Sequence, residues 1–395
     1  MRTNDDANGS DRRGTPGIGL RGGLARQPDV SSVCVIDRDR EQLDALGRKF
    51  QDGRLETVLC DVTDQDALAS ALSGCRAAVS AVPYFFNVGV TRTAIRAGVH
   101  LADMGGNTDV VFEQRKLDEE AKAAGVGVLP DQGLAPGLAG ILAGYGMREM
   151  DEVVSVKMRV GGLPVDPENT LRYALVFSIH GLINEYVGEA VCLENGEIVM
   201  RPTLTGLEEI RFPSPVGSAE AAYTSGGTST LPWTFRGKVR QLDYKTVRYP
   251  GHWTRFQFLH EMGLLSSDPI EVGGHEVAPR DVLATLLEPR LYVPDVRDLV
   301  VLRVTVRGEK DRQGLVRRYD LLDFFDEKTG LTAMMRTTAY PAAESALLLA
   351  RGTIEERGVL LAEEVVPGEA YLRALRARGL RIQEKETQVD NGDEG

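Results

Sequence analysis

Residues 76–106, RAAVSAVPYFFNVGVTRTAIRAGVHLADMGG, decide the fold that this sequence predicts. They open with a short apolar run over 76–83, continue with helical spacing over 88–99, and end with a second apolar run over 100–106. A strand, a helix and a second strand joined by short connections form a unit whose strands lie parallel in one sheet. We therefore expect an α/β fold with helices on both faces of a parallel sheet.

The same alternation extends outward from this unit. Strands are predicted at SSVCVID (31–37) and ETVLCDV (56–62) before it, and at GVLPDQG (127–133) after it. Such sheets bind their ligands at the carboxyl ends of the strands, as Rossmann folds bind dinucleotides. The residues at these ends are therefore candidates for dinucleotide binding: Asp37, Arg38, Asp61, Val62, Ala81, Val82, Pro83, Asp103, Gln132 and Gly133.

Asp37 is the residue from which we expect a preference between NAD and NADP. An acidic group at the end of this strand accepts hydrogen bonds from an adenosine ribose. Its carboxylate would repel a 2′-phosphate, which favours NAD over NADP, although the adjacent Arg38 weakens that preference. Asp61 and Val62 are expected to contact the adenine. The alternative for Asp37 and Asp61 is that each only caps a helix.

A glycine motif precedes these strands. Gly17, Gly19 and Gly22 match G-x-G-x-x-G, the turn that cradles a pyrophosphate. The segment before the motif does not have the pattern of a buried strand, so a first strand is lacking, and the helix after it is short. A phosphate-binding turn and a chance match within a disordered leader (1–23) are two interpretations of equal weight.

The character of the chain changes after a predicted helix over 134–146. Longer strands with alternating polarity follow, and they predict a second, α+β domain with a largely antiparallel sheet. We place strands at 300–308, 316–326 and 331–340, helices at 341–354 and 363–379, and a polar tail from Lys385. The expected domains are 24–146, 147–338 and 339–395.

The composition narrows the function classes. The 395 residues carry 46 basic and 58 acidic side chains, and no basic run exceeds Arg317-Arg318. With a net charge of −12, neither nucleic acid nor a membrane surface is expected as a partner. No apolar run reaches the roughly 18 residues that span a bilayer, and the polar, acidic first residues are not expected to act as a secretory signal. The four cysteines lack metal-ligand spacing, so we expect no metal and a reduced, cytoplasmic setting.

Candidate catalytic residues crowd into one strand of the second domain. Tyr244, Lys245, Arg248 and His252 lie within nine residues. In a strand, Tyr244 and Arg248 share one face and Lys245 faces away. Arg248 would clamp a substrate carboxylate, and Lys245 or His252 would act as a base if its pKa were lowered, with Tyr244 as a further candidate. The alternative is a solvated strand face with ordinary ion pairs.

Two further stretches supply candidate substrate contacts. The hydroxyl- and glycine-rich loop 224–229 begins with Thr224 and Ser225, which would donate hydrogen bonds to a carboxylate. Glu185 and Tyr186 would meet a substrate amine. The alternatives are a flexible connector for the loop and a core position for Tyr186.

Several long motifs resemble one known family. They include PDQGLAPG (130–137), VGGLP (160–164), YTSGGTSTL (223–231), LDYKTVRY (242–249) and TTAY (337–340). Over about residues 24–384 the chain resembles the saccharopine dehydrogenase-like family, most closely its L-lysine 6-dehydrogenases. Residues 1–23 depart from the family pattern.

The resemblance implies a Rossmann domain, a second domain that closes over the substrate and carries a homo-oligomer contact, and a C-terminal segment returning to the first domain. It implies NAD-dependent oxidative deamination of the ε-amino group of L-lysine to allysine, which cyclises to 1-piperideine-6-carboxylate. Two alternatives stay open. One is a saccharopine-type reductase joining an amino acid to an aldehyde or 2-oxo acid, favoured if an extra arginine lies in the cleft. The other is an inactive dinucleotide-binding protein with a disrupted glycine turn.

Overall fold

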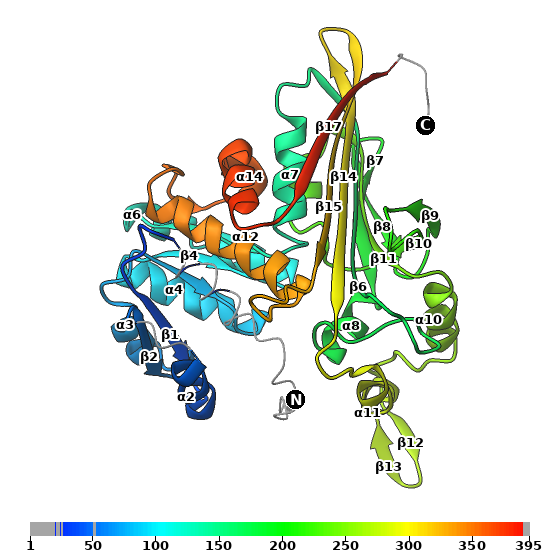
Figure 1. Cartoon of the computed structure of the whole chain (residues 1–395), viewed down its shortest axis with the longest axis horizontal. Helices are drawn as coiled ribbons and strands as arrows, with labels where there is room; N and C mark the ends of the chain where they lie inside the picture. The colour runs from blue at the N-terminus through cyan, green and yellow to red at the C-terminus, as the bar shows by residue number, and fades with distance from the viewer. Residues whose placement is uncertain (1–19, 21–23, 25–26, 50–52, 390–395) are drawn as a thin grey trace.

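The computed structural model describes residues 20, 24, 27–49 and 53–389 of the chain. Figure 1 shows parallel strands with their helices on one side, a large sheet on the other, and α12 and α14 between them. The predicted glycine motif, with Gly17, Gly19 and Gly22, lies outside the described residues, as does most of the predicted leader 1–23.

The parallel strands form two sheets. Four strands lie in the order β16-β5-β4-β3, and β1 pairs with β2 in a separate parallel pair. Their bounds are β1 (Val33–Asp37), β2 (Leu55–Leu59), β3 (Ala77–Ser80), β4 (His100–Asp103), β5 (Gly127–Leu129) and β16 (Gly358–Val359). Among the described residues no strand joins β1 to β3, and the sequence lacks a first-strand pattern before β1.

Short helices connect these strands, as the alternating pattern predicts. They are α2 (Arg40–Lys49), α3 (Gln65–Leu72), η1 (Tyr84–Phe86), α4 (Asn87–Ala97), α5 (Thr108–Arg115) and α6 (Asp118–Ala123). The parallel arrangement brings the loops after β3, β4 and β5 to one edge.

The large sheet has nine strands and is mostly antiparallel. Its main order is β17-β15-β14-β6-β11-β10-β9, with β7 and β8 attached beside β11, and only β6 and β11 run parallel. The bounds are β6 (Glu152–Pro164), β7 (Glu189–Glu194), β8 (Glu197–Pro202), β9 (Glu208–Arg211), β10 (Ser218–Tyr223), β11 (Val239–Arg248), β14 (Asp298–Lys310), β15 (Gln313–Phe324) and β17 (Ile382–Val389). The α/β fold class with a second, largely antiparallel sheet is therefore confirmed.

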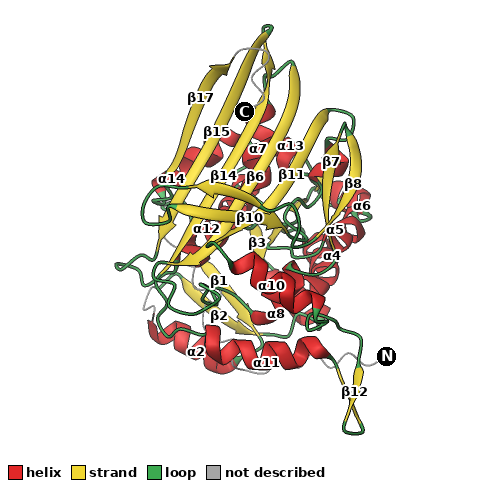
Figure 2. Cartoon of the chain, turned by 90° about the vertical axis from the view of Figure 1, so that its right-hand side faces the viewer, coloured by secondary structure: helices red, strands yellow, loops and turns green. Residues whose placement is uncertain are grey.

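Helices lie on both faces of this sheet. Figure 2 views the face that carries α8 and α10, with α7 behind the strands. The remaining elements are α7 (Leu138–Met147), α8 (Ile179–Glu185), α9 (Leu231–Thr234), α10 (His252–Glu261), β12 (Ile270–Val272), β13 (His275–Val277), α11 (Pro279–Leu291), α12 (Ala333–Ala350), α13 (Ala362–Val365) and α14 (Gly368–Ala377). No helix of the described residues is long and apolar enough to cross a membrane.

One apolar core joins the two parts of the molecule. The largest cluster of buried side chains contains Leu129 of β5, Leu142 of α7, Val304 of β14 and Leu348 of α12. Helix α12 contacts β3 and β4 as well as β14, so it links the parallel strands to the large sheet. The loops at the edge of the parallel strands therefore face the second part across a shared core.

The strand predicted over 331–340 is wrong, because these residues begin α12. Asp298 accepts the backbone N–H groups of Ala333 (2.7 Å) and Met334 (2.8 Å), and Thr332 caps Met335. These contacts satisfy the first turn of the helix. The helix then continues through the buried Pro341, which the sequence pattern indicated as its start.

The polar tail from Lys385 is also wrong in its first residues. Residues Ile382–Val389 form β17, which pairs antiparallel with β15 from Leu321↔Ile382 to Gly314↔Val389. An edge strand is held by backbone hydrogen bonds, so exposed polar side chains give it no apolar pattern. The helix predicted over 363–379 is interrupted at Val366-Pro367 and forms α13 and α14.

Candidate active site

The ends of β1 and β2 bring three predicted cofactor residues together. Asp37 ends β1, and its Oδ1 accepts the backbone N–H of Asp39 (2.9 Å). Arg38 is exposed and lies near Asp61, whose pKa is lowered by hydrogen bonds from Thr63 and by Arg38. The helix-cap alternative fails for both acids, because Asp39 caps α2 and Asp64 caps α3. Val62 packs beside the apolar cluster under this edge.

Asp103 ends β4, but its side chain is buried below the loops at the carboxyl edge of the parallel strands. Its fully buried carboxylate accepts hydrogen bonds from Asn87 (3.1 Å), Gln114 (2.7 Å) and the Gly105 N–H (2.8 Å). Burial and the neighbouring Asp131 raise the pKa of Asp103 to about 7. Asp103 thereby fixes the loop after β4. The predicted residues Ala81, Val82 and Pro83 follow β3 and lead into η1.

Asp131 follows β5 in a left-handed backbone conformation, with φ of 59°. Its N–H donates to Asp103 (3.2 Å), and its carboxylate accepts the Gly106 N–H (3.3 Å) and the hydroxyl of Ser229. A Cβ at Gly105 would lie 1.6 Å from Asp131 Oδ1, so only glycine permits this approach. The loop after β4, the loop after β5 and the second part of the molecule meet at this carboxylate.

Gln132 and Gly133 continue the same turn. The Gln132 amide donates to the Pro130 carbonyl (2.7 Å) and accepts from the hydroxyl of Ser345 on α12 (2.7 Å). Gly133 donates its N–H to the Pro136 carbonyl (3.0 Å). Gln132 is therefore held inside the protein, with both polar atoms of its side-chain amide already bonded to protein groups.

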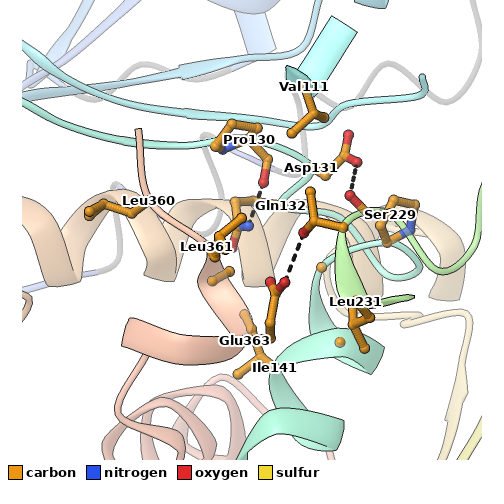
Figure 3. A pocket seen from close by; sticks show the side chains of 15 residues that line it. Val111, Pro130, Asp131, Gln132, Ile141, Ser229, Leu231, Leu360, Leu361 and Glu363 are labelled. Atoms are coloured by element: carbon orange, nitrogen blue, oxygen red, sulfur yellow. Dashed lines mark hydrogen bonds between the residues drawn. The ribbon is translucent and has the colours of Figure 1, made fainter. Parts of the chain in front are cut away.

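A small hollow of about 20 Å³, room for about one water molecule, opens next to Asp131 (Figure 3). Its lining comes from α5, from the turn after β5 and the start of α7, from residues 229–231, and from α13 with the two residues before it. The lining residues are Val111, Pro130, Asp131, Gln132, Pro136, Gly137, Gly140, Ile141, Ser229, Thr230, Leu231, Leu360, Leu361, Ala362 and Glu363. No lysine, arginine or histidine is among them.

Two carboxylates line this hollow. Glu363 is 6 % exposed and accepts hydrogen bonds from the hydroxyls of Thr230 (2.8 Å) and Thr234 (2.7 Å), while Asp131 is 4 % exposed. Burial raises the pKa of each carboxyl. Buried carboxylates without a basic partner favour a cationic ligand or a proton.

The sequence does not predict the hollow. Asp131 lies inside the PDQG motif (130–133), so the motif itself points to Asp131 as a candidate site residue. Glu363, Ser229 and Thr230 come from distant segments, and no sequence signal indicated that they meet.

Arg248 lies in a second, separate cluster with Glu185, Tyr186 and His252. Its Nε donates to the Tyr186 hydroxyl (2.9 Å), Nη1 to the Val247 carbonyl (3.0 Å), and Nη2 lies 3.4 Å from the Glu185 carboxylate. Arg248 is 2 % exposed. The structure thus brings together these four predicted residues, with every guanidinium nitrogen already in contact with the protein.

His252 does not have the properties of a base. Its Nε2 lies 2.9 Å from the Tyr186 hydroxyl and its Nδ1 lies 2.9 Å from the Leu171 carbonyl. Burial and the nearby Arg248 lower its pKa to about 3. A histidine with so low a pKa takes up little proton at neutral pH.

Lys245 and Tyr244 lie on opposite faces of β11, as predicted. Lys245 Nζ donates to the Gly206 carbonyl (2.6 Å) and to Glu208 (2.8 Å), in an ion-pair group with Arg159. Tyr244 faces the other way, and a Cβ at Gly227 would lie 2.2 Å from its ring. Lys245 is therefore separated from Arg248 and from the hollow.

Loop 224–229 connects the two clusters. At one end, Thr224 shares a hydroxyl hydrogen bond with Thr246 (2.7 Å), and Ser225 donates its N–H to the Glu185 carbonyl (3.0 Å). At the other end, Ser229 donates to Asp131. The loop is held at both ends and lies between the Arg248 cluster and the hollow.

Fold and site together define a two-part α/β protein of the kind that binds a ligand at the carboxyl ends of its parallel strands. Family models agree: residues 15–129 match the saccharopine dehydrogenase NADP binding domain, and residues 133–380 match the saccharopine dehydrogenase C-terminal domain. The chain belongs to the saccharopine dehydrogenase family.

Curated relatives and solved structures are consistent with this membership. The chain is 25 % identical to a Saccharomyces cerevisiae saccharopine dehydrogenase (NADP⁺, L-glutamate-forming), over 77 % of this chain and 69 % of the relative. It is 23 % identical to a Vibrio alginolyticus carboxynorspermidine synthase, over 84 % of each. The apo saccharopine dehydrogenase of S. cerevisiae shares the fold, with a TM-score of 0.78 and 22 % identity over 95 % of this chain and 98 % of that one. A Legionella pneumophila homospermidine synthase in complex with NAD has a TM-score of 0.63 and 12 % identity, over 95 % and 91 %.

Proposed function

We propose that this chain oxidises the ε-amino carbon of L-lysine, with NAD as hydride acceptor, and releases ammonia. The observation that carries this proposal is the hollow beside Asp131 and Glu363. Two buried carboxylates in a lining without any basic residue suit an alkylammonium group. The ε-end of lysine has this chemistry: an ammonium on an apolar chain.

The described residues fit the adenosine end of a dinucleotide. Asp37 presents a carboxylate at the end of β1, where ribose hydroxyls can donate to it, and the Asp39 N–H fixes its orientation. We propose NAD on this ground, with Arg38 as the residue that would favour the phosphorylated form. When bound, the nicotinamide would accept hydride near Gln132 and Gly133.

The Arg248–Glu185 pair suits the other end of an amino acid. A lysine α-carboxylate would face the guanidinium, and its α-ammonium would face Glu185. For this binding the 3.4 Å ion pair would have to open, because Arg248 is buried and its nitrogens already contact the protein. Loop 224–229 would then lie along the substrate chain between the two clusters.

A second candidate is a reductase that joins an amine or amino acid to an aldehyde or 2-oxo acid. The activities of two relatives, a saccharopine dehydrogenase and a carboxynorspermidine synthase, favour it. Such a substrate brings another carboxylate, for which an extra arginine is expected. The lining of the hollow contains no basic residue, which supports the lysine reaction instead.

An assay of the pure protein separates these functions. One reaction contains lysine and NAD, and a parallel reaction contains saccharopine and NADP. The absorbance of the reduced nicotinamide measures turnover in each. Lysine alone is expected to reduce NAD and to yield ammonia and 1-piperideine-6-carboxylate, identified by mass spectrometry. Turnover only with saccharopine, or only with lysine, a 2-oxo acid and NADPH, would overturn the proposal.

A further inference from the structure

Three buried carboxyl groups gather at the edge of the parallel strands. The backbone N–H of Asp131 donates to Oδ1 of Asp103, and Asp131 lines the same hollow as Glu363. The three carboxyls influence one another's ionisation. The negative charge of Asp131 raises the pKa of Asp103, and the negative charge of Glu363 raises the pKa of Asp131. Glu364 is the further charged group that faces Glu363, and it too is acidic.

The protein supplies no cation to this group. Among the described residues, no salt bridge reaches Asp103, Asp131 or Glu363, although surface acids elsewhere are paired. A buried carboxylate in this setting holds a proton more tightly than one in water. Such a group accepts a proton from an ammonium at neutral pH more readily than an ordinary aspartate.

The backbone directs Asp131 into the hollow at a cost in conformational energy. Asp131 and its partner Ser229 both have positive φ, 59° and 46°. Non-glycine residues in this region are strained and persist where surrounding contacts require them. Here the surrounding contacts place a carboxylate and a hydroxyl from opposite parts of the molecule against each other.

We propose that Asp131 is the base that deprotonates the substrate ammonium, and that Ser229 orients its carboxylate for this transfer. This inference rests on the proposed function, because it needs an amine substrate in the hollow. Glu363, held by two threonine hydroxyls, stays as the second negative charge that attracts the ammonium.

The transfer balances in protons and electrons. One N–H bond of R–CH₂–NH₃⁺ breaks, its proton moves to a carboxylate oxygen of Asp131, and the electron pair stays on nitrogen. That pair would form a C=N bond as the carbon gives up hydride, which a bound oxidised nicotinamide dinucleotide would accept. Water then adds to the resulting iminium, and ammonia leaves. The aspartic acid returns its proton to solvent or to the leaving amine.

The pH profile of kcat/KM tests the role of Asp131. In the wild type, activity rises with pH as the base loses its proton. Asp131→Asn is expected to lower kcat by about 100-fold or more and to abolish this acidic limb. Glu363→Gln is the matched control, a buried carboxyl of the same hollow; it is expected to raise KM for the amine while the limb remains. An acidic limb that persists in Asp131→Asn would overturn the assignment.

Ser229→Ala tests the same role without removing the carboxylate. The Ser229 hydroxyl lowers the pKa of Asp131, so its loss is expected to move the acidic limb to higher pH. An unmoved acidic limb in Ser229→Ala would contradict the inference.

These outcomes separate the inference from the proposed function. The profile is measured with whichever amine reduces the dinucleotide. If saccharopine is that substrate and lysine is not, the lysine specificity fails, while loss of the limb in Asp131→Asn still supports the base.

Discussion

Arg248, Tyr186 and His252 form one line of buried hydrogen bonds. Arg248 donates to the Tyr186 hydroxyl, which leaves that hydroxyl to donate to Nε2 of His252, while Nδ1–H of His252 donates to the Leu171 carbonyl. This tautomer is inferred from the partners. A second proton, on Nε2 of His252, would point at the proton that the Tyr186 hydroxyl donates. All three hydrogen bonds therefore form together only when the imidazole is neutral.

The pH dependence of stability tests this arrangement. The folded pKa of His252 is about 3, below the ordinary value of 6.5, so below pH 6.5 the unfolded chain binds one more proton than the folded chain. His252 therefore lowers the free energy of unfolding as pH falls from 6.5 towards 3. The difference in free energy of unfolding between the wild type and His252→Gln is therefore expected to fall by about 1.4 kcal/mol for each pH unit below 6.5.

Urea unfolding of both proteins from pH 7 to pH 4 measures that difference, and buried carboxyls such as Asp298 cancel because both proteins contain them. His180→Gln removes an exposed histidine and is expected to retain the wild-type slope. A constant difference between wild type and His252→Gln would refute the neutral, buried histidine.

Asp37 and Arg38 make opposite predictions for the cofactor. Asp37→Ala removes a charged acceptor for ribose hydroxyls, so NAD affinity is expected to fall roughly 10- to 100-fold, and the discrimination against NADP should relax. Arg38→Ala, the adjacent control, should weaken NADP and leave NAD nearly unchanged. Dissociation constants for both dinucleotides decide the point, and equal affinities in wild type and Asp37→Ala would reject the ribose contact.

At the scale of elements, the turn after β4 holds the site together. Gly105 and Gly98 both have positive φ, 67° and 69°, but a Cβ at Gly105 would meet Asp131, whereas at Gly98 it meets nothing within 4 Å. Both alanine substitutions carry the same conformational cost of about 1 kcal/mol. Only Gly105→Ala must also displace Asp131.

We therefore expect Gly98→Ala to lower stability and keep activity, and Gly105→Ala to lower stability further and lose most of kcat. Thermal unfolding and initial rates of the two variants are compared. Equal rates would show that the approach of Gly105 to Asp131 does not matter for turnover.

The elements also show what sequence patterns can and cannot predict. Strands β1 to β5 lie close to their predicted positions, because each is a short apolar run between helical segments. Helix α12 was missed over 333–340, since its first turn depends on Asp298, a residue of a distant strand. In the same way the motif around Asp131 was visible, but its meeting with Ser229 and Glu363 depends on tertiary contacts between residues 98 or more positions apart.

For the whole molecule, the shared core predicts cooperative unfolding. Leu129 and Ala102 of the parallel strands belong to the same buried cluster as Val304 and Leu321 of the large sheet. Neither part can lose its packing alone without exposing that cluster. Calorimetry is expected to show one transition with equal calorimetric and van't Hoff enthalpies. Two resolved transitions would mean that the parts unfold independently.

The arrangement of the whole molecule places the hollow where the two parts meet. A dinucleotide at the edge of the parallel strands and an amine beside Asp131 would be enclosed by loop 224–229 and the segment before α13. The most direct test is a crystal structure with NAD and L-lysine bound. The account predicts the lysine ε-nitrogen within hydrogen-bond distance of the Asp131 carboxylate, with the nicotinamide against the same carbon. Lysine bound elsewhere, with the hollow filled only by solvent, would contradict it.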